Sequence, residues 1–174
     1  MATDLCGNNY VSYSDTADAT PLNIYTGQQS TVVRSTVVNN QSVLTEWMAP
    51  VIQPGSVVQY DIYRSIDNTN FSHIATVPAQ QTDYMDNDVD VQATNYFYRV
   101  DVINQCNIQA VISNDGSSIL LKGEKNIIGV TLNWTDYIGW NTGVDHYVIE
   151  RLDANGNWQV LGMVPGNVTS FEDH

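Results

Sequence analysis

The chain has 174 residues, of which 43% are hydrophobic, and its 19 acidic residues against six basic ones give a formal net charge of −13. This charge repels phosphate backbones and anionic lipid surfaces, so the chain is not expected to bind nucleic acid. No apolar run is long enough to cross a bilayer, so membrane insertion is not expected either.

The composition favours β-structure along the whole chain. Val, Ile, ten Tyr and four Trp are residues that strands prefer, and Asn, Asp, Ser, Thr and Gly fill the segments between them. No window has the sustained spacing of apolar residues that an amphipathic helix requires. The sequence therefore predicts an all-β fold.

Residues 1–20 are expected to be the terminal strand or strands of a preceding module. The segment "DLCGNNYVSYSD", at 4–15, is similar to "NQCNIQAVISND", at 104–115, and places Cys6 at the position of Cys106. Because the second segment is the end of a predicted module, the first is expected to be one as well.

Residues 21–113 are predicted to form one complete module of short antiparallel strands. Turn-forming stretches separate runs in which every second residue is apolar, such as Tyr96, Tyr98, Val100 and Val102. This alternation means that one face of each strand is buried and the other is exposed. The predicted strands lie within 22–38 and at 42–48, 58–66, 71–77, 82–86, 95–104 and 108–113, which is typical of a β-sandwich.

Residues 114–174 repeat the first part of this module 87 positions later. The stretch "YDIYRSIDNTNFSHIATVP", at 60–78, corresponds without a gap to "YVIERLDANGNWQVLGMVP", at 147–165. The same offset relates Trp47 to Trp134. A period of this length indicates tandem domains rather than a solenoid, whose repeats are shorter. The short linker "SNDGSS", at 113–118, is expected to keep successive modules semi-rigid.

The second copy is expected to begin with "SSILLKG", at 117–123, as its first strand and to be truncated in its fifth strand, strand E. Half a sandwich exposes apolar surface and an unpaired edge, so the parent protein is expected to be longer, with at least three modules. Alternatively, the unpaired strands at the two ends complement one another or a neighbouring chain.

Three motifs resemble the fibronectin type III domain. They are a Trp at the end of the second strand, "YDIYR" at 60–64 and "TNYFYRV" at 94–100. The resemblance implies antiparallel immunoglobulin-like sandwiches in tandem, with the Trp in each core and a tyrosine corner made by Tyr96. It implies structural roles for Trp47, Tyr60, Tyr96, Trp134 and Tyr147.

A narrower resemblance is to modules of very large surface proteins of Bacteroidota. It rests on "CGN" at 6–8, "IYRSIDNTNFSHIATV" at 62–77 and "ILLKGE" with "LNW" at 119–134; the inner copy departs from it, with "CNI" at 106–108. Those proteins are similar to the SprB adhesin, are exported by the type nine secretion system and are associated with gliding motility.

This resemblance implies a non-enzymatic structural or adhesive segment of a large secreted protein, located extracellularly on the cell surface. The implied partners are neighbouring modules of the same polypeptide, surface glycans or proteins, and the secretion machinery. Two alternatives stay open: an accessory or spacer segment of a secreted hydrolase whose catalytic domain lies elsewhere, and a stalk that presents a secretion signal.

One acidic stretch, "DYMDNDVDV" at 83–91, is a candidate calcium site. Asp86, Asp88 and Asp90 alternate along it, and calcium prefers several carboxylate and carbonyl oxygens. The stretch lacks the Gly and the distal Glu of an EF-hand loop. The alternative is a turn whose side chains accept hydrogen bonds from the backbone. No other cofactor is expected.

No stretch has the pattern of an active site, so the chain is not expected to be an enzyme. His73, His146 and His174 lie in unrelated segments without further metal ligands, and no G-x-S-x-G motif is present. Cys6 and Cys106 are expected to be buried free thiols, with disulfides to residues outside this sequence as the alternative.

Two further positions are candidate sites on loops. Thr16, in "DTA" at 15–17, resembles the O-glycosylation motif of exported Bacteroidota proteins; the alternative is an ordinary linker. Trp140 lies in the Gly-containing loop "DYIGWNTG" at 136–143, and exposed loop Trp side chains often contact ligands. Packing of Trp140 against the neighbouring domain is the equal alternative.

Overall fold

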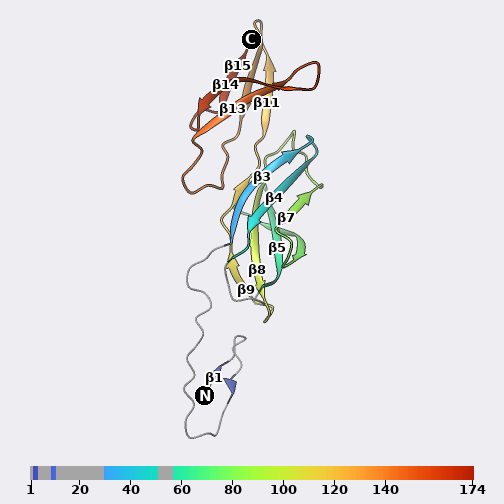
Figure 1. Cartoon of the computed structure of the whole chain (residues 1–174), viewed down its shortest axis with the longest axis vertical. Coiled ribbons are helices and arrows are strands. Elements are labelled where there is room, and N and C mark those ends of the chain that lie inside the picture. Colours follow the sequence, from blue (N-terminus) through green and yellow to red (C-terminus); the bar gives the residue numbers. More distant parts are fainter. Residues whose placement is uncertain (1, 4–8, 11–29, 51–56) are drawn as a thin grey trace.

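The computed structural model describes residues 2–3, 9–10, 30–50 and 57–174, and these ranges form antiparallel β-strands and no helix. Accordingly, no helix in these ranges is long and apolar enough to cross a membrane. Two groups of sheets follow one another along the long axis of the molecule (Figure 1). We call them module 1, residues 30–50 and 57–118, and module 2, residues 119–174.

Module 1 contains two facing sheets. The smaller has the order β3-β4-β7 and consists of β3 (Thr31–Val38), β4 (Ser42–Met48) and β7 (Asp83–Asp86). The larger has the order β10-β8-β5-β6, with β9 also pairing β8. It consists of β5 (Val57–Ser65), β6 (Ser72–Pro78), β8 (Phe97–Asn104), β9 (Gln109–Ile112) and β10 (Gly116–Ser117).

The core of module 1 lies between these sheets because alternate residues of each strand point inward. Tyr60 and Ile62 on β5 face the same interior as Tyr98, Val100 and Val102 on β8. Each fully buried side chain of this size stabilises the fold by about 1.5–3 kcal/mol. The sequence-predicted structural residues of this module lie in the same core, with exposed fractions of 3% for Trp47, 1% for Tyr60 and 8% for Tyr96.

Module 2 repeats the pairing of the first strands of module 1. One sheet has the order β11-β12-β15 and the other pairs β13 with β14. Their bounds are β11 (Leu121–Lys125), β12 (Val130–Trp134), β13 (His146–Leu152), β14 (Trp158–Pro165) and β15 (Ser170–Asp173).

The 87-residue repeat is visible in the geometry. The β5–β6 pair has a bulge between Ile62 and Tyr63, and the β13–β14 pair has one between Ile149 and Glu150. The Trp47 ring meets Tyr60 edge-on at 5.4 Å, and its counterpart Trp134 meets Tyr147 at the same distance. The predicted fold class, antiparallel immunoglobulin-like sandwiches in tandem, is confirmed.

The link between the modules differs from the sequence-based expectation. The second copy was expected to begin with a strand at 117–123, but β11 begins at Leu121, and Ser117 belongs to β10 of module 1. The reason is hydrogen bonding: Ser118 N–H donates to the carbonyl of Tyr96 at 2.8 Å, and Ser118 Oγ accepts from Tyr96 N–H at 2.9 Å. These bonds hold residues 116–118 on the edge of β8.

A separate short hairpin pairs β1 (Ala2–Thr3) with β2 (Asn9–Tyr10). In its register Thr3 lies opposite Asn9, and one hundred positions later Ile103 lies opposite Gln109 in the β8–β9 pair. The rest of the predicted segment 1–20 lies outside the described residues. The predicted domain bounds, 1–20, 21–113 and 114–174, stay predictions.

Candidate interaction surfaces

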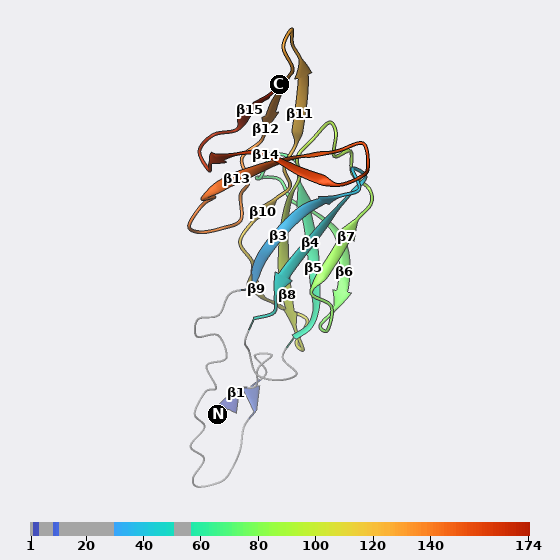
Figure 2. The ribbon, with the colours of Figure 1, turned by 45° about the horizontal axis from the view of Figure 1, so that its top comes forward.

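Hydrogen bonds join the two modules at their junction. Figure 2 shows this junction, where β3 and β10 of module 1 lie next to module 2. Asn114 accepts from Val32 N–H at 2.8 Å and donates to the carbonyl of Gly139, in module 2, at 2.7 Å. Ser117 N–H donates to the carbonyl of Ile138 at 2.7 Å, and Ile138 N–H donates back to Ser117 Oγ at 2.7 Å. The linker is therefore bonded to both modules.

A glycine permits this close approach. A Cβ atom at Gly116 would lie 2.5 Å from Cγ1 of Val32, which is buried in the core of module 1. Any larger residue would push the linker away from β3. The sequence predicts a short linker, but the hydrogen bonds of this linker to both modules depend on tertiary structure.

Trp140 lies at this junction. Its indole Nε1–H donates to the carbonyl of Val33 on β3 at 2.9 Å, and its ring lies 4.7 Å from the ring of Tyr137. Its side chain is still half exposed. The structure thus places Trp140 against the neighbouring module; a role as a ligand contact stays a prediction.

The acidic stretch predicted to bind calcium lies beside β5. Asp86 is 2% exposed and accepts hydrogen bonds from Arg64 Nη1 at 2.9 and 3.1 Å and from the Tyr98 hydroxyl at 3.0 Å. Burial raises the pKa of Tyr98 far above its ordinary value, and the Asp86 charge raises it further, so the hydroxyl stays a donor. The Asp88 carboxylate lies 3.5 Å from Arg64.

The third predicted calcium ligand, Asp90, accepts from the N–H groups of Gln92 and Ala93 at 3.1 and 3.2 Å. No group of three acidic, His or Cys residues in the described ranges could hold a metal ion. Asp86, Asp88 and Asp90 are thus engaged with protein donors, and calcium binding stays a prediction. A thermal midpoint unchanged by millimolar calcium would reject it.

Tyr96 forms the tyrosine corner that the resemblance to fibronectin type III domains implies. Its hydroxyl accepts from Asp90 N–H at 2.9 Å, six residues upstream, which fixes the loop that precedes β8.

In module 2 the hydroxyl of Tyr147 accepts from Tyr137 N–H at 3.2 Å. Trp134 and Tyr147 are half-buried, so their faces are less completely covered than those of Trp47 and Tyr60.

The outer face of the larger sheet of module 1 carries two opposed carboxylates. Asp61 on β5 pairs directly with Asp101 on β8. Asp61 accepts from Thr76 Oγ1 at 2.6 Å, and Asp101 Oδ2 accepts from Gln109, but Asp101 Oδ1 is buried without a partner. Burial raises the pKa of Asp101, although Gln109 and Arg99 act in the opposite direction. No signal in the sequence marks this pair, because the register between two strands cannot be derived from either strand alone.

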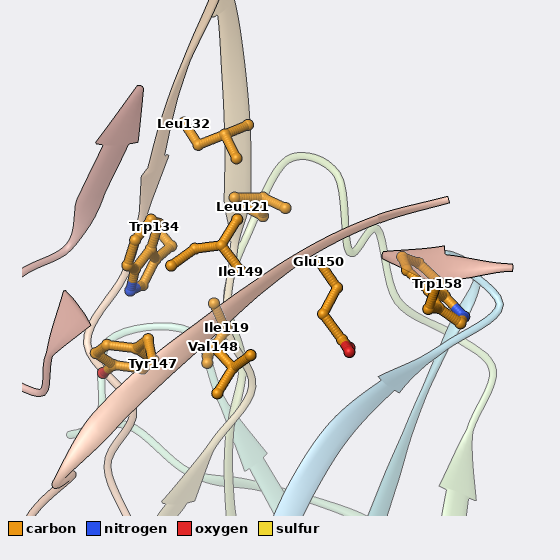
Figure 3. Close-up of a pocket in the computed structure, with 9 residues that line it drawn as sticks. All are labelled: Ile119, Leu121, Leu132, Trp134, Tyr147, Val148, Ile149, Glu150 and Trp158. Carbon is orange, nitrogen blue, oxygen red and sulfur yellow. The ribbon is translucent and has the colours of Figure 1, made fainter. Parts of the chain in front are cut away.

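The inner face of module 2 is an open apolar surface. It lines a hollow of about 270 Å³, shown in Figure 3. The residues that line it come from both sheets of module 2 and from the segment just before β11: Ile119, Leu121, Leu132, Trp134, Tyr147, Val148, Ile149, Glu150 and Trp158. Two of these, Trp134 and Tyr147, were predicted as structural residues.

Exposure distinguishes this face from its counterpart. Val32, opposite Trp47 in the β3–β4 pair, is 0% exposed, whereas Leu121, opposite Trp134 in the β11–β12 pair, is 57% exposed. The same chain therefore contains one covered and one uncovered version of the same face.

Two remaining predictions concern modification. Thr16 and Cys6 lie outside the described residues. Cys106 is disulfide-bonded, so the expectation of a free thiol at this position is wrong.

The strand order, the core Trp and the tyrosine corner together define fibronectin type III-like modules. No protein-family model matches the chain, and no curated protein matches it. A Fn3-like protein from Clostridium thermocellum is 22% identical over 57% of this chain and 93% of its own, with a TM-score of 0.42.

Two other solved structures are similar. A two-domain fibronectin type III segment of chicken tenascin is 16% identical over 83% of this chain and 80% of its own, with a TM-score of 0.39. Pectate lyase PelI from Erwinia chrysanthemi is 24% identical over 51% of this chain, with a TM-score of 0.43, and the chain covers 28% of that enzyme. All three TM-scores are below 0.5, so the fold assignment rests on the strand pairing described above.

Proposed function

We propose that the chain is a non-enzymatic structural and adhesive segment of a large secreted cell-surface protein. Its modules set a fixed spacing between neighbouring modules and present their outer surfaces to partners. The proposed parent is of the SprB-like kind that Bacteroidota export by type nine secretion and use in gliding motility. The proposed partners are neighbouring modules, surface glycans or proteins, and the export machinery.

The observation that carries this proposal is the bonded junction. Residues 114–118 make hydrogen bonds to module 1 and module 2, and the Trp140 indole adds another across the same boundary. Flexible Gly- and Ser-rich linkers behave as random coils, whereas a linker with its polar groups paired to both sides transmits orientation. A semi-rigid succession of modules suits display at a distance from the cell surface.

The spacing role is tested by distance measurement in the full chain. Genetically encoded spin labels at Ser72 on β6 and Val160 on β14, both exposed, report the separation of the modules. We expect one narrow distance distribution. Replacing both Asn114 and Trp140 with Ala removes the side-chain hydrogen bonds to Gly139 and Val33 across the junction and is expected to broaden the distribution.

Trp158→Ala provides the matched control, because Trp158 is 65% exposed, compared with 50% for Trp140, and does not touch the junction. This variant should leave the distribution unchanged. A distribution in the unmodified chain as broad as that of the double variant would contradict the spacing role. Antibodies to the chain that fail to label intact source cells would contradict the surface location.

A further inference from the structure

The two opposed carboxylates of module 1 lie at the centre of its larger sheet. Asp61 and Asp101 are register partners on β5 and β8, the two inner strands of the order β10-β8-β5-β6 (Figure 2). Both side chains lie on the outer face, because the neighbours of Asp61 along the strand, Tyr60 and Ile62, point into the core. Like charges directly opposite one another destabilise a pair of strands. The β5–β8 pair is therefore weakened whenever both groups are charged.

Hydrogen-bond donors surround Asp61. Its Oδ1 accepts from Thr76 Oγ1–H at 2.6 Å and from Gln59 Nε2–H at 3.2 Å. Because the Thr76 hydroxyl gives its proton to Asp61, its oxygen accepts from His73 Nε2–H, at 3.1 Å. A chain of hydrogen bonds thus runs from β6 to Asp61. An ionised carboxylate only accepts, so these donors suit Asp61 as the charged member of the pair.

Asp101 has an oxygen that no donor serves. Its Oδ2 accepts from the Gln109 side chain, but its Oδ1 is buried and receives no hydrogen bond from the described residues. The whole residue is only 7% exposed. A buried charged oxygen without a donor is costly. A proton on Oδ1 removes that charge and makes the group a donor.

A proton fits this oxygen better than a metal ion does. Calcium takes several oxygen ligands, and the described residues contain no group of three acidic, His or Cys side chains that could hold a metal. Because Oδ1 of Asp101 is buried, a hydrated ion has no access to it. A proton needs no such space.

The groups on β8 and β9 act on Asp101 in both directions. Burial raises the pKa of Asp101 the most, the Gln109 bond and the Arg99 charge lower it, and the Asp61 charge raises it again. Arg99 is itself held by Asp115, with Nε and Oδ1 2.8 Å apart. The pKa of Asp101 is raised on balance, in agreement with the geometry of its unserved oxygen.

The groups on the other packed strands add one charge that titrates. His73 on β6 lies 3.7 Å from Asp61 and, when protonated, favours the charged form of a carboxylate. Tyr63 on β5 meets the His73 ring edge-on at 5.4 Å, and burial raises the pKa of Tyr63, so its hydroxyl is uncharged. The β9 residue opposite Asp101 is Ile112, which does not titrate. His73 is therefore the group that the experiment must separate from the pair.

We propose that Asp61 and Asp101 form a proton-binding site that stabilises the β5–β8 pair in acid. One proton is held on Oδ1 of Asp101 while Asp61 stays charged, so the repulsion across the two strands is removed. Because the folded pKa of Asp101 is raised, this contribution is fully present below its ordinary value of 3.8 and is lost as the pH rises through the folded pKa. The two carboxyl groups titrate as one coupled unit.

The direct test follows the carboxyl carbon of Asp101 by NMR in the full chain from acidic to neutral pH. We expect its midpoint to lie above 3.8. Asp61→Asn keeps an oxygen for the Thr76 and Gln59 donors but removes the charge, so it should lower this midpoint by about half a pH unit. Asp145→Asn removes the same charge from a side chain that is 96% exposed in module 2, and should leave the midpoint unchanged.

Unfolding in urea gives a second measurement. At neutral pH, Asp61→Asn and Asp101→Asn should each raise the urea midpoint, and the double variant should not exceed Asp101→Asn, because the repulsion is then already gone. At about pH 3 these differences should vanish. Only differences between variants are compared, because the lowered pKa values of Asp67 and Asp153 make the total stability fall in acid.

His73→Gln separates the histidine from the pair. It keeps an N–H donor for Thr76 but does not titrate, so the effect of Asp101→Asn at the two pH values should be the same in this background. An effect that disappears there would overturn the proposal, since the histidine would then be the proton-binding group.

Three further results would overturn it. They are an Asp101 midpoint at or below 3.8, the same midpoint in Asp61→Asn as in the unmodified chain, and a displacement of the Asp101 signal by calcium or magnesium at constant pH. The last would make a metal ion the occupant of the site.

Discussion

The same ion pair occurs twice in this chain in different surroundings, which allows a matched prediction. In module 1, Asp86 holds Arg64 and the Tyr98 hydroxyl under the cover of β8. In module 2, Asp173 holds Arg151 at the uncovered face. We compare Asp86→Ala with Asp173→Ala. Each substitution removes the carboxylate of one Arg–Asp ion pair, so a difference in the loss of stability reflects the difference in exposure.

The expected magnitudes follow from burial. Asp86 is 2% exposed and Arg64 21%, so Asp86→Ala leaves a mostly buried guanidinium and a buried hydroxyl without their acceptor. Breaking a buried pair in this way costs about 3–5 kcal/mol. Arg151 is 58% exposed, and water and salt screen its pair with Asp173, so Asp173→Ala should cost less than about 1 kcal/mol.

Hydrogen exchange followed by mass spectrometry resolves the two modules in one sample. We expect amide protection in β5 and β8 to fall by about a hundredfold or more in Asp86→Ala, and protection in β13 to fall by less than about fivefold in Asp173→Ala. Equal losses in the two variants, or a loss below tenfold in module 1, would refute the burial argument.

Three further predictions concern single positions. Burial raises the pKa of Asp101 above its ordinary value of 3.8, so protonated Asp101 contributes stability that is fully present below that value and is lost as the pH rises through the folded pKa. Asp101→Asn, which removes the charge facing Asp61, should therefore increase the free energy of unfolding in urea by about 0.5–1 kcal/mol at pH near 7 and have little effect at pH near 3; an equal effect at both would contradict this. Tyr96→Phe leaves Asp90 N–H without its acceptor and should lower the free energy of unfolding by about 1 kcal/mol, and a change below about 0.3 kcal/mol would show that the corner bond is dispensable. Cys106 should resist alkylation in the native chain and react only after reduction, as measured by intact mass; alkylation without reductant would show that the disulfide is absent.

Local pattern was enough to predict most of the strands. Predicted segments at 42–48, 58–66 and 71–77 coincide within one residue with β4, β5 and β6, because alternation of apolar and polar residues depends only on which face of a strand is buried. The linker was less predictable. Ser117 and Ser118 have no strand pattern, and hydrogen bonds to module 1 hold them at the edge of β8.

For the candidate sites too, the sequence identified the residues of interest, and the tertiary structure decided what they contact. The sequence identified Trp140 as a loop residue of interest but could not choose between a ligand contact and a module contact, since its partner Val33 is 107 positions away. The acidic stretch at 83–91 suggested calcium because carboxylates alternate there. The structure adds Arg64 and Tyr98 as donors to Asp86, both from strands that are distant in sequence.

The sequence by itself determined the all-β class, the 87-residue repeat and the residues that each core requires, because these follow from periodicity and from the match between two segments of one chain. Only the tertiary structure decided which copies of those residues are covered. Arg64 and Arg151 are equivalent in sequence and each holds a carboxylate, yet the side chain of the first, opposite Tyr98 on β8, is 21% exposed and that of the second is 58% exposed. Burial depends on the neighbouring strand, and sequence equivalence does not report that neighbour.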